Sequence, residues 1–178
     1  MSFNIRLIST LAIFLMVIVL DGSAQNYEVI NLERLLNSET TTQKSSVQKA
    51  SVNKSSLTPK MDIAQIRSLI YEVNPTIYIE NGEIKFYGEG NPTVGDLNIN
   101  EWETLKTDNP YFNSVQLLKI KYDGNIANRG FDLSQLKAFN NLEYIYIQCT
   151  SKCSMVALED LFENVDGISI VYLITITE

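Results

Sequence analysis

The sequence contains no histidine, and this absence removes several classes of chemistry at once. Ser-His-Asp and Cys-His catalysis, zinc sites with histidine ligands and switching by imidazole protonation all need that side chain. Basic residues are also few, since Asp and Glu outnumber Lys and Arg by 17 to 8 between residues 61 and 178. An acidic surface repels phosphate backbones. We therefore expect no histidine-based catalysis, no metal or cofactor site and no nucleic-acid binding.

A long apolar run occurs near the N-terminus, over residues 7–20. Arg6 precedes this run and small residues ending at Ala24 follow it, a pattern typical of a cleaved export signal. The run is shorter than the roughly 20 residues that a helix needs to cross a bilayer. An uncleaved anchor is the competing interpretation. We predict that residues 1–24 are a signal peptide, and that the mature chain is periplasmic or extracellular and has no membrane span.

Apolar residues are sparse between residues 38 and 60, where Ser, Thr, Lys and Gln dominate and aromatic residues are absent. Such a segment buries too little surface to offset the entropy lost on ordering. We predict a flexible tail over residues 25–60, followed by a single folded domain over residues 61–178. Within the tail, Asn31 and the leucines that follow it also allow a short amphipathic helix; these leucines are Leu32, Leu35 and Leu36.

The folded domain is predicted to begin with a helix that Asp62 caps and that runs to about Val73. Its apolar residues have the spacing of one buried helix face, and Pro75 prevents its continuation. These residues are Ile63, Ile66, Leu69, Ile70 and Val73.

Two alternating segments follow, at residues 76–80 and 83–87, and Asn81-Gly82 joins them. Both positions of a type I′ turn need a positive φ, which Asn-Gly tolerates best, so the pattern predicts a β-hairpin. Gly88, Gly90, Pro92 and Gly95 then predict a loop. Asn100 is expected to cap a short helix that contains Trp102.

Three segments share one apolar spacing. They read FNSVQLLKIKY, FNNLEYIYIQC and FENVDGISIVY, and they begin at Phe112, Phe139 and Phe162. Apolar residues recur at offsets 0, 3, 6, 8 and 10, and the last three offsets share one face of a strand. The spacing predicts units of a helix or turn followed by a strand, which stack into a parallel sheet. Strands are expected at about 115–122, 142–149 and 165–176, with the last one at the edge of the sheet.

This spacing resembles the leucine-rich repeat, whose pattern is L-x-x-L-x-L-x-x-N. LEYIYIQCT and VQLLKIKYD match the apolar positions, while the asparagine position holds Asp123, Thr150 and Leu173. The fold class we predict is α+β: a short leucine-rich-repeat-like stack preceded by a helix and a β-hairpin. A generic α+β sandwich is the alternative. The resemblance implies an exposed strand face that binds a protein or another ligand.

The residues at offsets 5, 7 and 9 point away from the predicted core. Two tyrosines lie among them, and tyrosine is common at binding hot spots. We predict a binding face made of Lys119, Lys121, Tyr144, Tyr146, Gln148 and Ser169. The alternative is that a helix or the hairpin covers this face.

Cys149 and Cys153 are the two cysteines of the chain. In an exported protein such a close pair is expected to form a structural disulfide. Because the loop that it closes is short, the disulfide is expected to stabilise the fold by only roughly 2 kcal/mol. Two free thiols, or a redox or metal-binding pair, are the alternatives.

These features favour a non-catalytic, monomeric binding protein with an unknown protein or surface ligand as its partner. A secreted inhibitor or immunity-type protein is a second hypothesis, in which the acidic segment 159–166 caps a basic target. A small hydrolase that uses paired carboxylates is a third. Its candidate residues by type are Glu101, Glu103, Glu159, Asp160 and Glu163.

Overall fold

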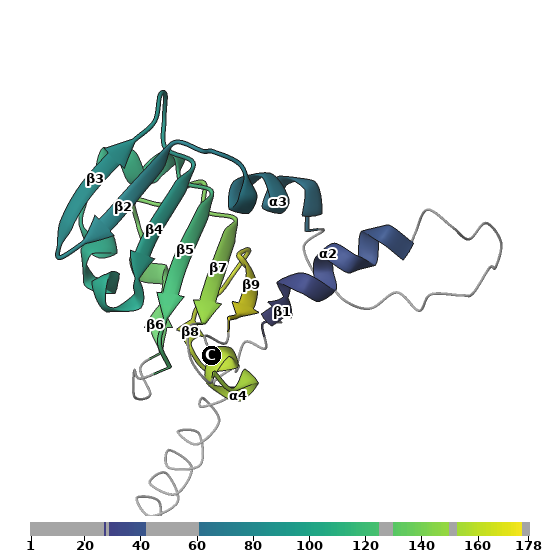
Figure 1. Cartoon of the computed structure of the whole chain (residues 1–178). Coiled ribbons are helices and arrows are strands. Elements are labelled where there is room, and N and C mark those ends of the chain that lie inside the picture. The colour runs from purple at the N-terminus through teal and green to yellow at the C-terminus, as the bar shows by residue number, and fades with distance from the viewer. Residues whose placement is uncertain (1–26, 28, 42–60, 125–129, 150–152, 176–178) are drawn as a thin grey trace, which may run out of the picture.

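A computed structural model describes residues 27, 29–41, 61–124, 130–149 and 153–175. Its helices and strands form an α+β fold around a seven-stranded sheet of order β1-β9-β7-β5-β4-β2-β3 (Figure 1). All neighbouring pairs are parallel except the hairpin of β2 and β3. The strands are β1 (Val29–Asn31), β2 (Thr76–Glu80), β3 (Glu83–Tyr87), β4 (Val94–Asn98), β5 (Leu117–Tyr122), β7 (Tyr144–Cys149) and β9 (Ser169–Ile174).

Helices, 3-10 segments and a small second sheet lie between these strands in the chain. The helices are α2 (Leu32–Thr41), α3 (Ile63–Tyr71) and α4 (Met155–Glu159), and the 3-10 segments are η1 (Ile99–Lys106), η2 (Pro110–Ser114) and η3 (Leu133–Gln135). A second, two-stranded parallel sheet pairs β6 (Phe131–Asp132) with β8 (Phe162–Glu163). Within the described ranges, no helix is long and apolar enough to cross a membrane. The predicted signal peptide lies outside these ranges.

The hairpin prediction is confirmed at both strands. Asn81 and Gly82 have φ values of 54° and 73°, as a type I′ turn requires. The predicted cap of α3 is confirmed as well, because Asp62 Oδ1 accepts a hydrogen bond from the Gln65 amide at 3.1 Å. The helix ends at Tyr71, however, and Val73 is fully exposed instead of buried.

Strand β4 occupies residues for which the sequence predicted a loop. Gly95 stands beside Leu118 of β5, in a column of the sheet that other strands fill with large apolar residues. A Cβ atom at Gly95 would lie 2.8 Å from Leu118 Cδ2, so the glycine makes room for that leucine. An apolar pattern does not detect a strand whose inward position is a glycine. The residue that caps η1 is Asn98, not Asn100.

Strands β5 and β7 pair in the register of equal offsets, with Leu118 opposite Ile145. The rings of Phe112 and Phe139 stack with centroids 4.5 Å apart, and the Asn140 amide donates to Asn113 Oδ1 at 2.7 Å. The segments that begin at Phe112 and Phe139 therefore lie side by side in equal register, and their phenylalanines and asparagines contact each other.

The third segment is shifted by two residues from its predicted alignment. Ile145 pairs with Ile170 and not with Ile168, because β8 and a turn at Gly167 (φ 75°) take up part of the segment. Phe162 stands opposite Phe131 in the small sheet instead of beside Phe139. The strand also begins at Ser169, later than predicted.

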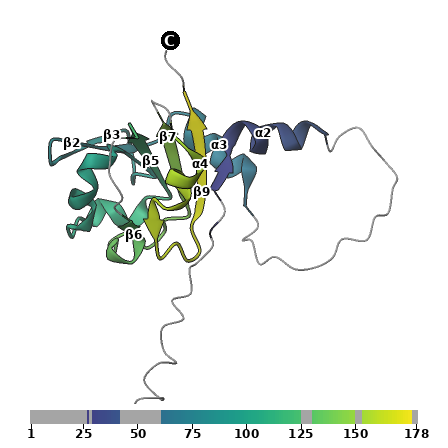
Figure 2. The same cartoon turned by 90° about the horizontal axis from the view of Figure 1, so that it is seen from below.

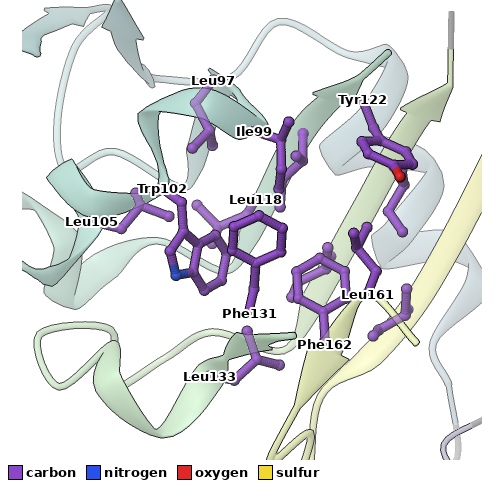
Figure 3. Close-up of a cluster of buried hydrophobic side chains, with 14 of the residues drawn as sticks. Leu97, Ile99, Trp102, Leu105, Leu118, Tyr122, Phe131, Leu133, Leu161 and Phe162 are labelled. Atoms are coloured by element: carbon purple, nitrogen blue, oxygen red, sulfur yellow. The ribbon is translucent and has the colours of Figure 1, made fainter. Parts of the chain in front are cut away.

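One face of the large sheet packs against the 3-10 segments and the small sheet. Trp102 lies between these layers, with its ring centroid 4.9 Å from that of Phe131 and 5.8 Å from that of Phe162 (Figure 3). Leu118 and Ile120 of β5 point into the same cluster and are fully buried. This core lies on the side of the sheet away from α2 and α3.

The predicted flexible tail is partly ordered, which corrects the start of the folded domain. Residues 29–31 form β1, which pairs with β9, so β9 is not the edge strand. Asn31 Oδ1 accepts from the Arg34 amide at 3.1 Å and caps α2, and Leu32 is fully buried. The Tyr27 hydroxyl donates to Leu158 O at 3.2 Å and accepts from the Phe162 amide at 3.0 Å. The leucines of α2 thus pack against the face of the large sheet, a contact that the sequence alone did not reveal.

Candidate functional site

The predicted binding face is the face of the large sheet that α3 covers. Helices α2 and α3 lie to the right of β9 in Figure 2, and β6 lies to its left. Tyr144 and Tyr146 are 4% and 2% exposed. They belong to a second apolar cluster that also contains Leu32, Ile66, Leu69, Ile70, Val94, Leu117 and Val171. The prediction that these tyrosines are exposed is therefore wrong, because α3 buries its apolar face against them.

Two polar contacts hold α3 against the sheet. The Tyr144 hydroxyl donates to Gln65 Oε1 at 2.9 Å, and the Lys119 ammonium donates to the carbonyl of Ile70 at 2.9 Å. Burial lowers the pKa of Lys119, and the negative charge of Asp96 opposes that shift. Lys119 therefore ties the last turn of the helix to β5.

The other predicted face residues differ in their surroundings. Gln148 and Ser169 are half-buried at the β7 and β9 positions of the face. Lys121 is exposed, and its ammonium lies 2.9 Å from Asp96 Oδ1. Leu173, rather than Val171, stands beside Gln148 because of the two-residue shift of β9. Of the six predicted residues, Lys121 remains on an open surface.

The same face continues uncovered across β2 and β3, at the left of Figure 1, where α3 does not reach. Tyr78 pairs with Lys85 on one side and with Asp96 on the other, so these side chains share the face. Tyr78 and Tyr87 are 36% and 60% exposed, and their rings meet edge to face with centroids 5.5 Å apart. A hollow of about 470 Å³ is lined by Tyr78, Glu80, Lys85 and Tyr87. We refer to these four residues as the open strip.

A second hollow of about 310 Å³ adjoins the open strip and shares Glu80 with it. Its other lining residues are Ile79, Asn81, Asp96, Leu97, Asn98, Glu101 and Lys121. Both carboxylate oxygens of Glu101 are engaged: they accept hydrogen bonds from the amides of Asn81 and Gly82 at 3.0 and 2.9 Å. Glu101 thereby fixes the hairpin turn above the hollow.

The two lysines that line the hollows, Lys85 and Lys121, are paired within the protein. Lys85 lies 3.1 Å from Glu83, whose hydrogen bond and charge raise the pKa of Lys85, and the charge of Glu80 adds to this shift. Lys121 is paired with Asp96. The strip therefore offers aromatic faces and hydrogen-bonding groups, while its positive charges already have partners.

The carboxylates considered for hydrolysis have other contacts or lie apart from the hollows. Glu101 holds the hairpin turn, and Glu103 lies 2.7 Å from the Lys106 ammonium. Glu159, Asp160 and Glu163 are exposed near α4 and β8. In the part of the chain that the structure describes, no group of His, Cys, Asp and Glu is arranged to hold a metal ion.

A strongly shifted carboxylate, Asp132, has a structural role. Its pKa is lowered to about 2, chiefly by hydrogen bonds from Asn164 and Ser134. The Asn164 amide donates to Oδ1 at 2.7 Å and the Ser134 amide at 2.9 Å, which caps η3 and joins it to the end of β8. This carboxylate therefore stabilises a corner of the fold.

Cys149 and Cys153 form a disulfide, with their Cα atoms 6.3 Å apart. Cys149 is fully buried at the end of β7, in the core that faces the small sheet. The bridge lies on the side of the sheet away from the open strip. It links the end of β7 to the residue that precedes the cap of α4.

Comparisons with known proteins found no matching family model, no matching curated protein and no matching solved structure. The site is therefore defined by its own geometry. The open strip was detectable in the sequence, because Tyr78 and Glu80 alternate with buried Ile77 and Ile79. The prediction chose the β7 tyrosines instead, because they occupy outward positions of the repeated spacing.

Proposed function

We propose that the protein is an exported, non-catalytic binding protein that recognises its ligand through the open strip and the adjoining hollow. In this proposal the parallel strands β5, β7 and β9 are leucine-rich-repeat-like units, and the hairpin extends their common face. The stacked Phe112 and Phe139 and the bonded Asn113 and Asn140 support equivalent units. The disulfide and the leader-like N-terminus support export.

The observation that carries the proposal is the exposure of two tyrosines in contact with each other beside a hollow. Tyrosine supplies a large contact area at low entropic cost, and tyrosines are enriched among the residues that dominate binding energy. The hollow beside them is shallow and open to solvent, so a partner can reach both rings. The absence of histidine and the engaged oxygens of Glu101 favour binding over catalysis.

The proposal is tested by immobilising the purified protein and capturing material from native envelope and medium extracts. The test variant is Tyr78→Ala/Tyr87→Ala, which removes both exposed rings of the strip. The matched control is Tyr111→Ala. Tyr111 is 49% exposed and stacks on Phe86, whose ring packs against the core on the opposite side of the sheet.

We expect the wild type and Tyr111→Ala to capture the same protein or polysaccharide, identified by mass spectrometry and sugar analysis, and the double variant to lose it. Capture that the double variant retains would show that the strip is not the binding site. Native-like circular dichroism spectra and cooperative urea transitions establish that all three proteins are folded. Because the rings are exposed, their removal is expected to leave the fold intact.

A further inference from the structure

Strand β3 forms the outer edge of the large sheet, beside the open strip (Figure 1). Among the described residues it pairs with β2 alone, so one side of its backbone has no neighbouring strand. The two-residue turn places Glu80 and Glu83 in a hydrogen-bonded pair, and such pairs alternate with non-hydrogen-bonded ones along an antiparallel ladder. The main-chain groups of Ile84 and Phe86 therefore point away from β2, toward the open edge.

This edge has two different faces. Ile84 and Phe86 are half-buried and pack against the core, whereas Glu83, Lys85 and Tyr87 are exposed on the face of the open strip. An extended segment of another protein can add to such an edge as a further strand. Main-chain hydrogen bonds then supply affinity, and alternate side chains supply specificity. An added strand would meet apolar side chains on one face, and charged and aromatic ones on the other.

The charge beside the edge is negative. Glu80 and Glu83 stand directly opposite each other, and like charges in this arrangement destabilise a pair of strands. Lys85 lies 3.1 Å from Glu83, but Glu80 has no ion pair among the described residues. Glu101, which accepts hydrogen bonds from two amides of the turn, adds another carboxylate. A basic side chain from a partner would compensate this excess of negative charge.

The exposed rings of the open strip also favour a cation. Tyr78 and Tyr87 lie in contact beside Glu80, in the hollow that all three residues line. A guanidinium or ammonium group is attracted to the face of an aromatic ring within about 6 Å. The acidic excess of 17 to 8 between residues 61 and 178 also attracts a basic partner during association.

A second copy of this chain fits the edge less well than a basic chain does. If two β3 strands paired with Ile84 opposite Phe86, the free main-chain groups of both copies would be used. The two copies of Lys85 would then face each other, and like charges directly opposite each other destabilise a strand pair. Repulsion between two acidic domains would oppose this pairing further.

We propose that β3 binds an extended basic segment of a partner protein, which adds to the large sheet as an outer strand. Alternate arginine or lysine side chains of the segment lie on the face of the open strip, against Glu83 and Tyr87 and toward Glu80. The intervening side chains lie on the opposite face, beside Ile84 and Phe86. This inference rests on the proposed function, because it names the class of partner that the open strip recognises.

The test is a titration of the isotope-labelled protein, expressed from the full chain, followed by NMR of its backbone amides. The probe is the synthetic peptide acetyl-Thr-Arg-Val-Thr-Val-Arg-Thr-amide. Its sequence reads the same in both directions, so its arginines can lie beside Glu83 and Tyr87 in either strand orientation. We expect the amide signals of Ile84 and Phe86 to shift and to exchange more slowly with solvent, because these amides gain hydrogen-bond partners.

Two matched peptides separate the contribution of the backbone from that of the charge. N-methylation of the three central residues removes their main-chain donors, and glutamate in place of both arginines reverses the charge. We expect neither peptide to change the signals of Ile84 and Phe86. Raising NaCl from about 50 to about 500 mM should weaken binding of the arginine peptide several-fold, because the attraction between exposed charges is screened.

Variants of the protein locate the site. We expect Tyr78→Ala/Tyr87→Ala to weaken binding of the arginine peptide by about tenfold or more. Glu80→Gln should weaken it several-fold, since it removes the carboxylate that lines both hollows. The matched control is Glu159→Gln, which removes an exposed carboxylate near α4 and should leave the affinity unchanged.

Three results would overturn the inference: no change at Ile84 and Phe86 with millimolar arginine peptide, equal binding of the N-methylated peptide, or equal binding of the glutamate peptide. Self-association in sedimentation, with slow exchange of the same two amides before any peptide is added, would assign the edge to a second copy and would also overturn it.

Failure of this inference is distinguishable from failure of the proposed function. If extract capture depends on Tyr78 and Tyr87 while the arginine peptide does not bind, the open strip recognises another class of ligand, such as a polysaccharide. The proposed function then stands and the basic segment is wrong. If neither assay depends on these rings, both proposals fail.

Discussion

One face of one sheet has two parts that differ sharply. Under α3, Leu117, Tyr144 and Tyr146 are almost fully buried, whereas Tyr78 and Tyr87 on β2 and β3 remain open to solvent. Tyr146 and Tyr78 lie in the same row of the sheet, joined through Lys119 and Asp96. The difference between them arises from the helix packed above and not from the strand. A tyrosine that points away from one core is therefore a binding candidate only where no second layer covers it.

The largest expected effect comes from the apolar packing of the covered part. Leu117→Ala removes a fully buried side chain between β5 and α3 and should cost about 2–5 kcal/mol of the free energy of unfolding. Tyr78→Ala on the open part should cost about 1 kcal/mol or less, since it loses mainly its contact with Tyr87. Urea unfolding monitored by circular dichroism measures both. Equal losses would mean that α3 does not seal the face.

The contact between Tyr144 and Gln65 gives a smaller effect. Tyr144→Phe removes the hydroxyl that donates to Gln65 Oε1 and should cost about 1 kcal/mol. A double-mutant cycle with Gln65→Ala isolates the interaction and should give a coupling energy of about 0.5–1.5 kcal/mol. A coupling energy near zero would place α3 elsewhere in solution.

The third effect is confined to alkaline pH. Burial raises the pKa of Tyr146 above its ordinary value of 10.0. The folded protein then keeps a proton that the unfolded chain releases above about pH 10, so a stabilisation present below that pH is lost as the pH rises through the folded-state pKa. Tyr146→Phe should therefore flatten the loss of stability above about pH 10, measured by urea unfolding at several pH values. A variant that loses stability as steeply as the wild type would contradict the burial of this hydroxyl.

The smallest effect is expected from the ion pair on the open part. Lys121 and Asp96 lie 2.9 Å apart, with side chains 48% and 17% exposed. Asp96→Asn should cost less than about 1 kcal/mol, and about 0.5 M NaCl should reduce that difference. Thermal unfolding at low and high salt provides the measurement. A larger, salt-independent loss would show that Asp96 has a role in the packing of the covered part.

Local signals in the sequence located several elements within a residue or two. Asp62 caps α3, Asn81-Gly82 turns the hairpin, and β5 and β7 keep equal offsets. The failures have identifiable causes. Strand β4 was not predicted because Gly95 interrupts its apolar pattern. The third segment pairs two residues out of its predicted register because β8 occupies its first residues.

For the candidate site, too, local patterns were read correctly while burial by distant elements was not. Alternation placed Tyr78, Lys85, Tyr144 and Tyr146 on outward positions, but it contained no information on which of them a second layer covers. Residues 29–41 read as a tail because their few apolar side chains gain stability only against β9 and the sheet face. That surface exists only after the rest of the chain has folded.

By itself the sequence determined the alternation of strand residues, the turns, the helix caps, the acidic surface and the absence of imidazole chemistry, because each depends on neighbouring residues or on composition. Only the tertiary structure decided that α2 and α3 cover β5, β7 and β9 and leave β2 and β3 open. That outcome depends on contacts between residues as distant in the chain as Gln65 and Tyr144. Burial is a property of two packed surfaces, and a local pattern specifies only one of them.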